Sequence, residues 1–383
     1  MTDMRIARME LFTIPPRWLF LRLETESGIV GWGEPIVEGR AEVVKTAVES
    51  LRPIILGWDS RRIEDFWQTS VRGGFYRGGP ILSSAVAGVD QALWDIKGKS
   101  LGVPIYELLG GLVRERIPAY SWIGGDEPTE VGEHASARID EGFKYFKMNI
   151  AGAVSYIPSN SEIQDILDRV TEVNRVTAPG LVALDFHGRV EYPGAKKILS
   201  LLEDLNPLFV EEPLRPELGH RLGELCQSTR IPIATGERLY SRHDFREIVS
   251  SGVALIQPDV SHAGGISETR RIANLAESHG VGLAPHSPLG PIALAASLQL
   301  DFCCHNAQFQ ETSLGIHYNT GHDLLSTVAN PEVFDLSEGC FQPPQEPGLG
   351  IQIIEESVRE LSKIGHNWKN PIWRDRTGAF VEW

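Results

Sequence analysis

Cysteine is scarce in this chain. Its 383 residues include four cysteines, none in a CxxC pair: Cys226, Cys303, Cys304 and Cys340. Cys303 and Cys304 are adjacent, which is a poor geometry for a disulfide. Free thiols are typical of a reducing compartment, so we expect a cytoplasmic protein.

Hydrophobic runs long enough to cross a membrane are also missing. A spanning helix needs about 18 or more consecutive apolar residues, and the chain contains no such stretch. The N-terminal residues MTDMRIARMELF lack the basic region, apolar core and small-residue cleavage site of a secretion signal. The sequence therefore predicts no membrane partner.

Basic residues are outnumbered by acidic ones. There are 36 Lys and Arg against 51 Asp and Glu, a formal net charge of −15. Nucleic-acid partners select clusters of positive charge, so this balance argues against nucleic acid. Apolar residues make up 42% of the chain, as in globular proteins, and its length suits one large domain plus a smaller one.

The first 115 residues predict a compact α+β domain. An antiparallel meander is indicated by the β-rich runs RIARMELFTI and WLFLRLET, followed by a turn and IVGWGE. A helix is predicted over residues 81–98, where apolar residues alternate at spacings of four and three. Strands followed by several helices favour a separate unit of this class.

From residue 116 to 345 the pattern predicts a (β/α)8 barrel of the TIM type. Short apolar runs, most followed by a helical stretch, occupy residues 117–123, 144–150, 181–186, 208–212, 231–237, 254–259, 281–286 and 307–311. Alternating strands and helices indicate parallel βαβ units, and eight of them indicate closure. The alternative is an open doubly wound sheet, but no glycine-rich phosphate fingerprint follows the early strands.

Polar residues recur at the ends of these runs. Successive members lie 22 to 27 residues apart, about one βα unit: Asp185, Glu211, Glu237, Asp259, His286 and Glu311. Catalytic residues of such barrels lie at the C-terminal ends of the strands. We therefore expect the six side chains to converge on one mouth of the barrel.

The three carboxylates Asp185, Glu211 and Glu237 predict a metal site. Carboxylates crowded together repel one another unless a cation compensates them. Ligation by oxygen alone favours a hard ion, and Mg²⁺ keeps positions open for substrate oxygens. The alternative is that these acidic residues only cap strands that face solvent. Three acidic residues at the ends of adjacent strands make this alternative weaker than a metal site.

Two histidines complete the candidate site. His187 lies two residues beyond Asp185, so the strand pleat would point both side chains the same way if the strand continued that far. His286 ends the seventh run, and Asp259 on the adjoining strand could accept a hydrogen bond that orients its ring. Among the other histidines, only His262 lies near the predicted mouth.

These motifs resemble the enolase superfamily. The likeness is to its mandelate racemase-like branch and, within that, to the D-galactonate dehydratases. It runs from the first strand to Trp383 and is carried by RGGFYRGGPILSSAVAGVDQALWDIKGK, DFHGR, VEEP, GER, QPDVSHAGG, LAPHSPLGPIALAA, QETSLGIHYN and NPIWR.

The resemblance implies a domain plan and a set of roles. Residues 1–115 would form a capping domain that closes over the barrel, and residues 346–383 would pack back onto this cap. The implied roles are Mg²⁺ ligands for Asp185, Glu211 and Glu237, base for His286 with Asp259 behind it, acid for His187, and enolate stabiliser for Glu311.

The implied activity is Mg²⁺-dependent dehydration of an acid sugar. D-Galactonate would lose water to give the 2-keto-3-deoxy acid. We expect this acid sugar to be the small-molecule partner, and we expect the protein to be a homo-oligomer. Three alternatives stay open: a dehydratase for another aldonate such as mannonate or gluconate, an epimerase or cycloisomerase on the same barrel, and a protein that kept the fold for binding alone.

Some positions depart from the relatives that the sequence resembles. Racemases of this branch carry a second lysine two residues after the one at the end of the second strand, but here Asn149 follows Lys147. Residues 150–161 do not match the loop expected of a D-galactonate dehydratase, and we expect this loop to reach the pocket. Residues 16–18 and 75–77 of the cap are further candidates for specificity.

Overall fold

The N-terminal part forms a three-stranded antiparallel sheet, as the sequence predicts. In the computed structural model, which describes residues 3–124, 128–152, 154–375 and 377–382, its order is β1 (Ile6–Ile14), β2 (Trp18–Thr25), β3 (Val30–Gly33). Helices follow it: α1 (Ala41–Ser50), α2 (Arg52–Ile55), α3 (Ile63–Arg72), α4 (Pro80–Leu101) and α5 (Ile105–Leu108). Ala153, within the loop of residues 150–161, and Trp383 at the end of the chain lie outside the described residues.

Helix α4 contains the helix predicted over residues 81–98 and extends it at both ends. Proline stands at its first position, and Gly102 ends it in the left-handed region with φ 71°. Strand β3 lies directly against this helix, since a Cβ on Gly33 would overlap the carbonyl oxygen of Gly88. This approach brings the end of β3 beside Gln91, whose Oε1 accepts a hydrogen bond from Glu34 N–H.

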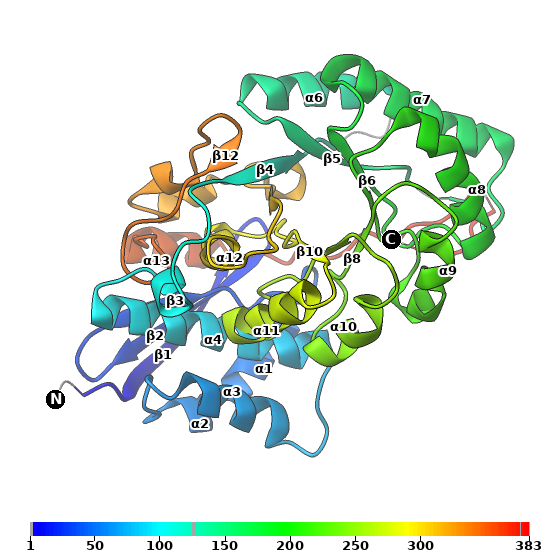
Figure 1. Ribbon diagram of the computed structural model, residues 1–383. Helices are drawn as coiled ribbons and strands as arrows, with labels where there is room; N and C mark the ends of the chain where they lie inside the picture. Colours follow the sequence, from blue (N-terminus) through cyan, green and yellow to red (C-terminus); the bar gives the residue numbers. More distant parts are fainter. Residues whose placement is uncertain (1–2, 125–127, 153, 376, 383) are drawn as a thin grey trace.

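All eight predicted barrel strands are present, and they pair in parallel. Their order follows the chain, and a bridge between Leu283 and Ala307 joins the two ends of the series. The strands are β4 (Ile117–Trp122), β5 (Tyr145–Asn149), β6 (Val182–Asp185), β7 (Val210–Glu211), β8 (Ile233–Thr235), β9 (Leu255–Ile256), β10 (Gly282–Leu283) and β11 (Gln310–Thr312). Figure 1 labels β4, β5, β6, β8 and β10 among them.

Side chains fill the interior of the barrel. Tyr120 and Phe209 pack edge to face with ring centroids 6.0 Å apart, in one cluster with small residues such as Ala183 of β6 and Ala234 of β8. The helices between the strands are α6 (Pro128–Asp140), α7 (Asn160–Thr177), α8 (Tyr192–Leu202), α9 (Leu222–Cys226), α10 (Arg242–Ile248), α11 (Gly265–Glu277) and α12 (Pro291–Asp301).

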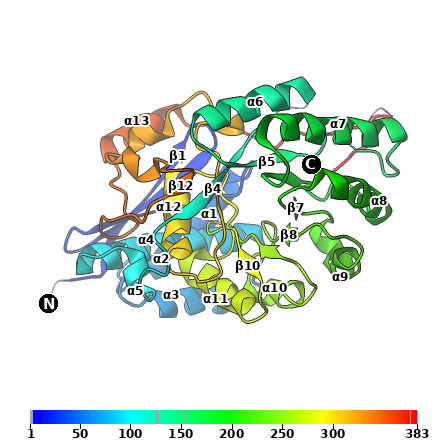
Figure 2. The ribbon, with the colours of Figure 1, turned by 45° about the horizontal axis from the view of Figure 1, so that its top comes forward.

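The C-terminal part connects the barrel to the N-terminal sheet. Strand β12 (Cys340–Phe341) pairs antiparallel with β4, and α13 (Glu355–Ile364) packs against β1. Arg22 Nε contacts Glu355 Oε2 at 2.9 Å. The chain then crosses to the side of α7 and α8, as the red trace in Figure 2 shows. The domain limits at 115 and 345 remain predictions.

Short 3₁₀ helices occupy several connections: η1 (Glu203–Leu205), η2 (Pro216–Arg221), η3 (His317–Asn319), η4 (Leu324–Thr327) and η5 (Pro331–Phe334). In the part of the chain that the structure describes, no helix is long and apolar enough to cross a membrane.

Candidate active site

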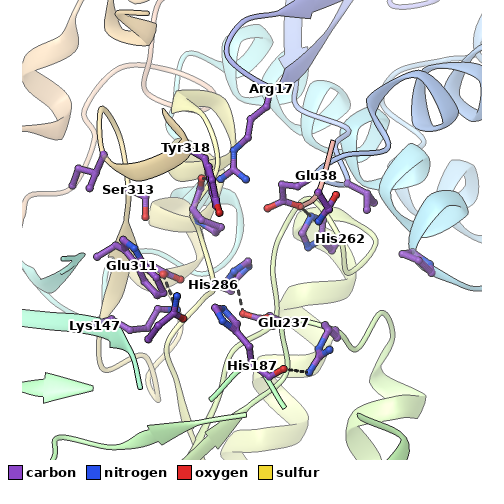
Figure 3. A pocket seen from close by; sticks show the side chains of 18 of the residues that line it. Arg17, Glu38, Lys147, His187, Glu237, His262, His286, Glu311, Ser313 and Tyr318 are labelled. Carbon is purple, nitrogen blue, oxygen red and sulfur yellow. Dashed lines mark hydrogen bonds and ion pairs between the residues drawn. The ribbon is translucent and has the colours of Figure 1, made fainter. Parts of the chain in front are cut away.

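The six predicted polar residues lie at the carboxyl ends of successive strands. A cavity of about 340 Å³ opens there between the barrel and the N-terminal domain (Figure 3). Asp185 is the last residue of β6 and Glu211 the last of β7, and Glu311 lies in β11. The other three follow their strands by two or three residues: Glu237 after β8, Asp259 after β9 and His286 after β10.

Lys147 stands among the carboxylates, although the predicted site did not include it. Its Nζ lies 2.7 Å from Glu311 Oε1, 2.9 Å from Glu211 Oε1 and 3.7 Å from Asp185 Oδ2. The side chain is 2% exposed. A buried ammonium so surrounded compensates part of the negative charge, and that charge keeps the pKa of Lys147 well above its ordinary value against the effect of burial.

Two of the predicted ligands form a group suited to a metal ion. Ligand atoms of Asp185, His187 and Glu237 all lie within 4.8 Å of one another. Asp185 Oδ2 and Glu237 Oε2 are buried, and each faces a histidine nitrogen, His187 Nε2 at 2.9 Å and His286 Nε2 at 3.1 Å. Buried carboxylate oxygens grouped in this way fit a hard divalent cation.

Glu211 is engaged differently. One of its oxygens accepts a hydrogen bond from Lys147 Nζ and the other from Gln257 Nε2, at 2.9 and 2.7 Å. Its place in the metal site therefore stays a prediction.

The charged form is disfavoured in two of the three carboxylates, Glu237 and Glu211. Burial raises the pKa of Glu237 well above its ordinary value, and repulsion by Glu212 and Asp185 adds to the rise. Burial also raises the pKa of Glu211 to about 7, although Lys147 acts in the opposite direction. A cation bound here would relieve this repulsion.

His286 and Asp259 form the predicted pair. His286 Nδ1 lies 2.8 Å from Asp259 Oδ2, and its Nε2 lies 3.1 Å from Glu237 Oε2. Asp259 Oδ1 accepts hydrogen bonds from the N–H groups of Ser261 and His262. Burial opposes protonation of His286, but the charge of Glu237 and the bond to Asp259 outweigh it and raise the pKa to about 10.

A turn after β6, and not the pleat of a continuing strand, positions His187 in the site. Strand β6 ends at Asp185, and His187 has φ 48°, in the left-handed region. The condition that the strand continues to His187 is thus not met. The turn folds the residue back onto Asp185, with its N–H 2.8 Å from Oδ1 and its Nε2 2.9 Å from Oδ2. Burial lowers the pKa of His187.

Cap residues form the opposite wall of the cavity. Arg17, 4% exposed, donates through Nε to Asn319 Oδ1 at 3.2 Å. Glu38 Oε2 lies 3.2 Å from His262 Nε2. The charges of Asp259 and Glu38 raise the pKa of His262 to about 9, against the effect of burial.

The other expected specificity segments lie elsewhere. Phe75 and Tyr76 are 90% and 88% exposed, and neither lines this cavity. None of the described residues of 150–161 lines it either. Trp373 of the C-terminal segment does, and a Cβ on Gly152 would touch its ring, so the tail lies between that loop and the cavity.

Sequence signals existed for two of the residues that the prediction missed, Lys147 and Gln257. Lys147 lies at the end of the second predicted strand, two residues before Asn149, where side chains of such barrels reach the mouth. Gln257 lies two residues before Asp259, so a strand continuing at that point would place both on one side. Glu38 follows a strand of the N-terminal sheet, and no pattern in the sequence connects it to His262.

Two family models match the chain. The N-terminal domain of mandelate racemase and muconate lactonizing enzymes matches residues 12–110, and the enolase C-terminal domain-like family matches residues 130–357. The chain belongs to the enolase superfamily. Both halves expected of this superfamily are thus present, with the cavity between them.

Relatives in the superfamily are close in length and sequence. D-galactonate dehydratases from Pectobacterium atrosepticum and Ralstonia nicotianae are each 50% identical over 99% of this chain and 100% of their own. A solved enolase from Agrobacterium radiobacter, provisionally described as a galactarate dehydratase and bound to Na and L-malate, superposes with a TM-score of 0.89. It is 28% identical and covers 99% of this chain and 100% of its own.

Proposed function

We propose that this protein dehydrates an aldonate in a Mg²⁺-dependent reaction, with D-galactonate as substrate and the 2-keto-3-deoxy acid and water as products. One observation carries the proposal: His187 and His286 both line the cavity, and Glu237 lies beside each of them (Figure 3), with Oε2 3.1 Å from His286 Nε2 and a ligand atom within 4.8 Å of one on His187. A base and an acid are thus available to one substrate. The 50% identity to two D-galactonate dehydratases supports the choice of sugar.

The side chains divide the reaction between them. His286, oriented by Asp259 through Nδ1, takes the proton from C2 of the substrate. His187 then protonates the departing 3-hydroxyl, and the resulting enol becomes the keto acid. Because burial lowers the pKa of His187, its protonated form gives up a proton readily.

Glu311 and Lys147, which also line the cavity, are placed to stabilise negative charge on the enolate. Glu311 accepts a hydrogen bond from Ser287 N–H at 3.0 Å and contacts Lys147 Nζ at 2.7 Å. We assign Glu311, in its protonated form, to donating a hydrogen bond to the enolate oxygens, with the positive charge of Lys147 beside it.

Asp185, Glu211 and Glu237 would hold the metal ion. Bound Mg²⁺ would stabilise negative charge on the substrate carboxylate and, by neutralising Glu237, would lower the pKa of His286 towards that of a base. Because positive charge is then concentrated at the site, an anionic substrate is compatible with the chain's net charge of −15.

A panel of acid sugars tests the proposal. The protein is incubated with Mg²⁺ and D-galactonate, D-mannonate, D-gluconate or galactarate, and keto acid is measured with semicarbazide. Turnover of D-galactonate above all others is the expected result. Faster turnover of another sugar would show that this sugar, and not D-galactonate, is the substrate. Solvent deuterium at C2 without loss of water favours an epimerase, and no reaction with any sugar contradicts the proposed dehydratase.

A further inference from the structure

Helix α4 of the N-terminal domain contacts the loop that carries Asp259. Gln91, fully buried, donates through Nε2 to Ser261 Oγ at 3.0 Å and to the Val260 carbonyl at 3.4 Å. Ser261 N–H in turn donates to Asp259 Oδ1 at 2.7 Å. Since Asp259 Oδ2 faces His286 Nδ1, a continuous series of contacts runs from Gln91 to His286.

A second contact reaches the loop that carries His286. Glu34 directly follows β3, and its N–H donates to Gln91 Oε1 at 2.8 Å. The Glu34 carboxylate accepts hydrogen bonds from Gly290 N–H and Ala293 N–H at the start of α12, at 2.7 and 2.9 Å. Gly290 lies four residues after His286, so Glu34 holds the far end of that loop.

Neither member of the pair stands on a strand. Strand β9 ends at Ile256 and β10 at Leu283, so Asp259 and His286 each lie three residues beyond the strands, where an isolated parallel bridge pairs them with each other. Loops are held less firmly than the elements they connect, and a base displaced by about 1 Å can lose roughly 100-fold in rate. Contacts from a second domain to both loops are therefore suited to fixing the position of the base.

We propose that Gln91, together with Glu34, is a positioning residue through which the capping domain sets the geometry of the Asp259–His286 pair. This inference rests on the proposed function of His286 as the base. Gln91 acts through Ser261 and Asp259 and does not touch the substrate. The alternative is that Gln91 only holds the two domains together. In that case, loss of any other buried contact between α4 and the barrel should have the same effect as loss of Gln91.

Trp94 provides the matched control. It lies three residues after Gln91 on the same helix and donates through Nε1 to Ser267 Oγ on α11 at 2.9 Å. Trp94→Phe removes one hydrogen bond between the cap and the barrel but leaves both loops of the pair untouched.

Nuclear magnetic resonance of the full-length, Mg²⁺-saturated protein tests the geometry without a substrate. With ¹⁵N-labelled histidine, the Nδ1–H of His286 gives a downfield resonance that is assigned by its loss in His286→Asn. In Gln91→Met this resonance moves upfield or is lost to solvent exchange, while in Trp94→Phe it is unchanged. An unchanged resonance in Gln91→Met overturns the proposal, and so does an equal shift in Trp94→Phe.

Kinetics then separate positioning from folding. Gln91→Met is expected to lower kcat by about 10- to 100-fold with little change in KM, and to raise the isotope effect of C2-deuterated substrate. Adding Ser261→Ala should cause little further loss, because both changes break one series of contacts. Full additivity contradicts the proposed route.

Two outcomes need a separate reading. If Gln91→Met does not fold, Ser261→Ala, which keeps the backbone N–H to Asp259, is examined by the same resonance, and an unchanged signal there overturns the proposal. A parent protein inactive on every acid sugar contradicts the proposed function, whereas the resonance still decides whether Gln91 positions His286.

Discussion

The imidazole of His286 lies between two carboxylates, with Nδ1 2.8 Å from Asp259 Oδ2 and Nε2 3.1 Å from Glu237 Oε2. We assign the first carboxylate to orienting the ring and the second to binding the metal ion. Asp259 Oδ1 also accepts hydrogen bonds from two backbone N–H groups, whereas Glu237 belongs with Asp185 and His187 to the group suited to a metal ion, so we expect the two carboxylates to serve different ends. Their substitution should therefore have separable effects.

Asp259→Asn should impair the base while leaving Mg²⁺ binding intact. The amide no longer accepts the proton on Nδ1, so the ring loses its orientation and part of its basicity. In another His–Asp pair the equivalent change lowers kcat by roughly 10⁴-fold. We expect a large loss here and a shift of the acidic limb of the pH–rate profile to lower pH. An unchanged profile would count against the pair.

Glu237→Gln should weaken Mg²⁺ binding and turnover together. The substitution removes one charge from the ion's ligands but keeps the volume of the side chain, so the melting temperature should change little. We expect affinity measured by calorimetry to fall by at least about 100-fold.

Glu268→Gln serves as its control. Glu268 on α11 is also a buried carboxylate, paired with Arg242 of α10 and Arg271 of α11. Normal Mg²⁺ affinity is expected in this variant. Equal affinities in the two variants would show that Glu237 is not a ligand.

Mg²⁺ affinity should rise with pH. In the metal-free protein burial raises the pKa of Glu237 well above its ordinary value and that of Glu211 to about 7. At low pH the ion must displace protons from these carboxyls, and above their pKa values it need not. Calorimetry in buffers of different protonation enthalpy counts the protons released. Affinity that is constant between about pH 6 and pH 8.5 would contradict this account.

The barrel was predictable because its signal repeats. Eight apolar runs at similar intervals predict eight strands, and each lies where expected. The convergence of Asp185, Glu211 and Glu311 follows from that period, since parallel strands bring their carboxyl ends together. The antiparallel sheet and helix α4 were predictable from local alternation and helical spacing.

The features of the site that could not be predicted from the sequence depend on local backbone turns and on the packing of distant segments. The turn that folds His187 back onto Asp185 requires a positive φ, which no periodicity reveals. Contacts from the cap, such as Glu38 with His262, join loops more than 200 residues apart. The exposure of Phe75 and the position of Trp373 against the cavity depend likewise on how the cap and tail meet the barrel.

Hydrogen exchange at C2 of the substrate tests the division of labour between the two histidines most directly. Each variant, His187→Asn and His286→Asn, is incubated with D-galactonate and Mg²⁺ in heavy water, and recovered substrate is examined by proton NMR. His187→Asn keeps the base, so it should replace the C2 hydrogen by deuterium while forming little keto acid. His286→Asn should do neither, because nothing remains in position to remove the proton. Exchange by His286→Asn without exchange by His187→Asn would contradict the account and reverse the two roles.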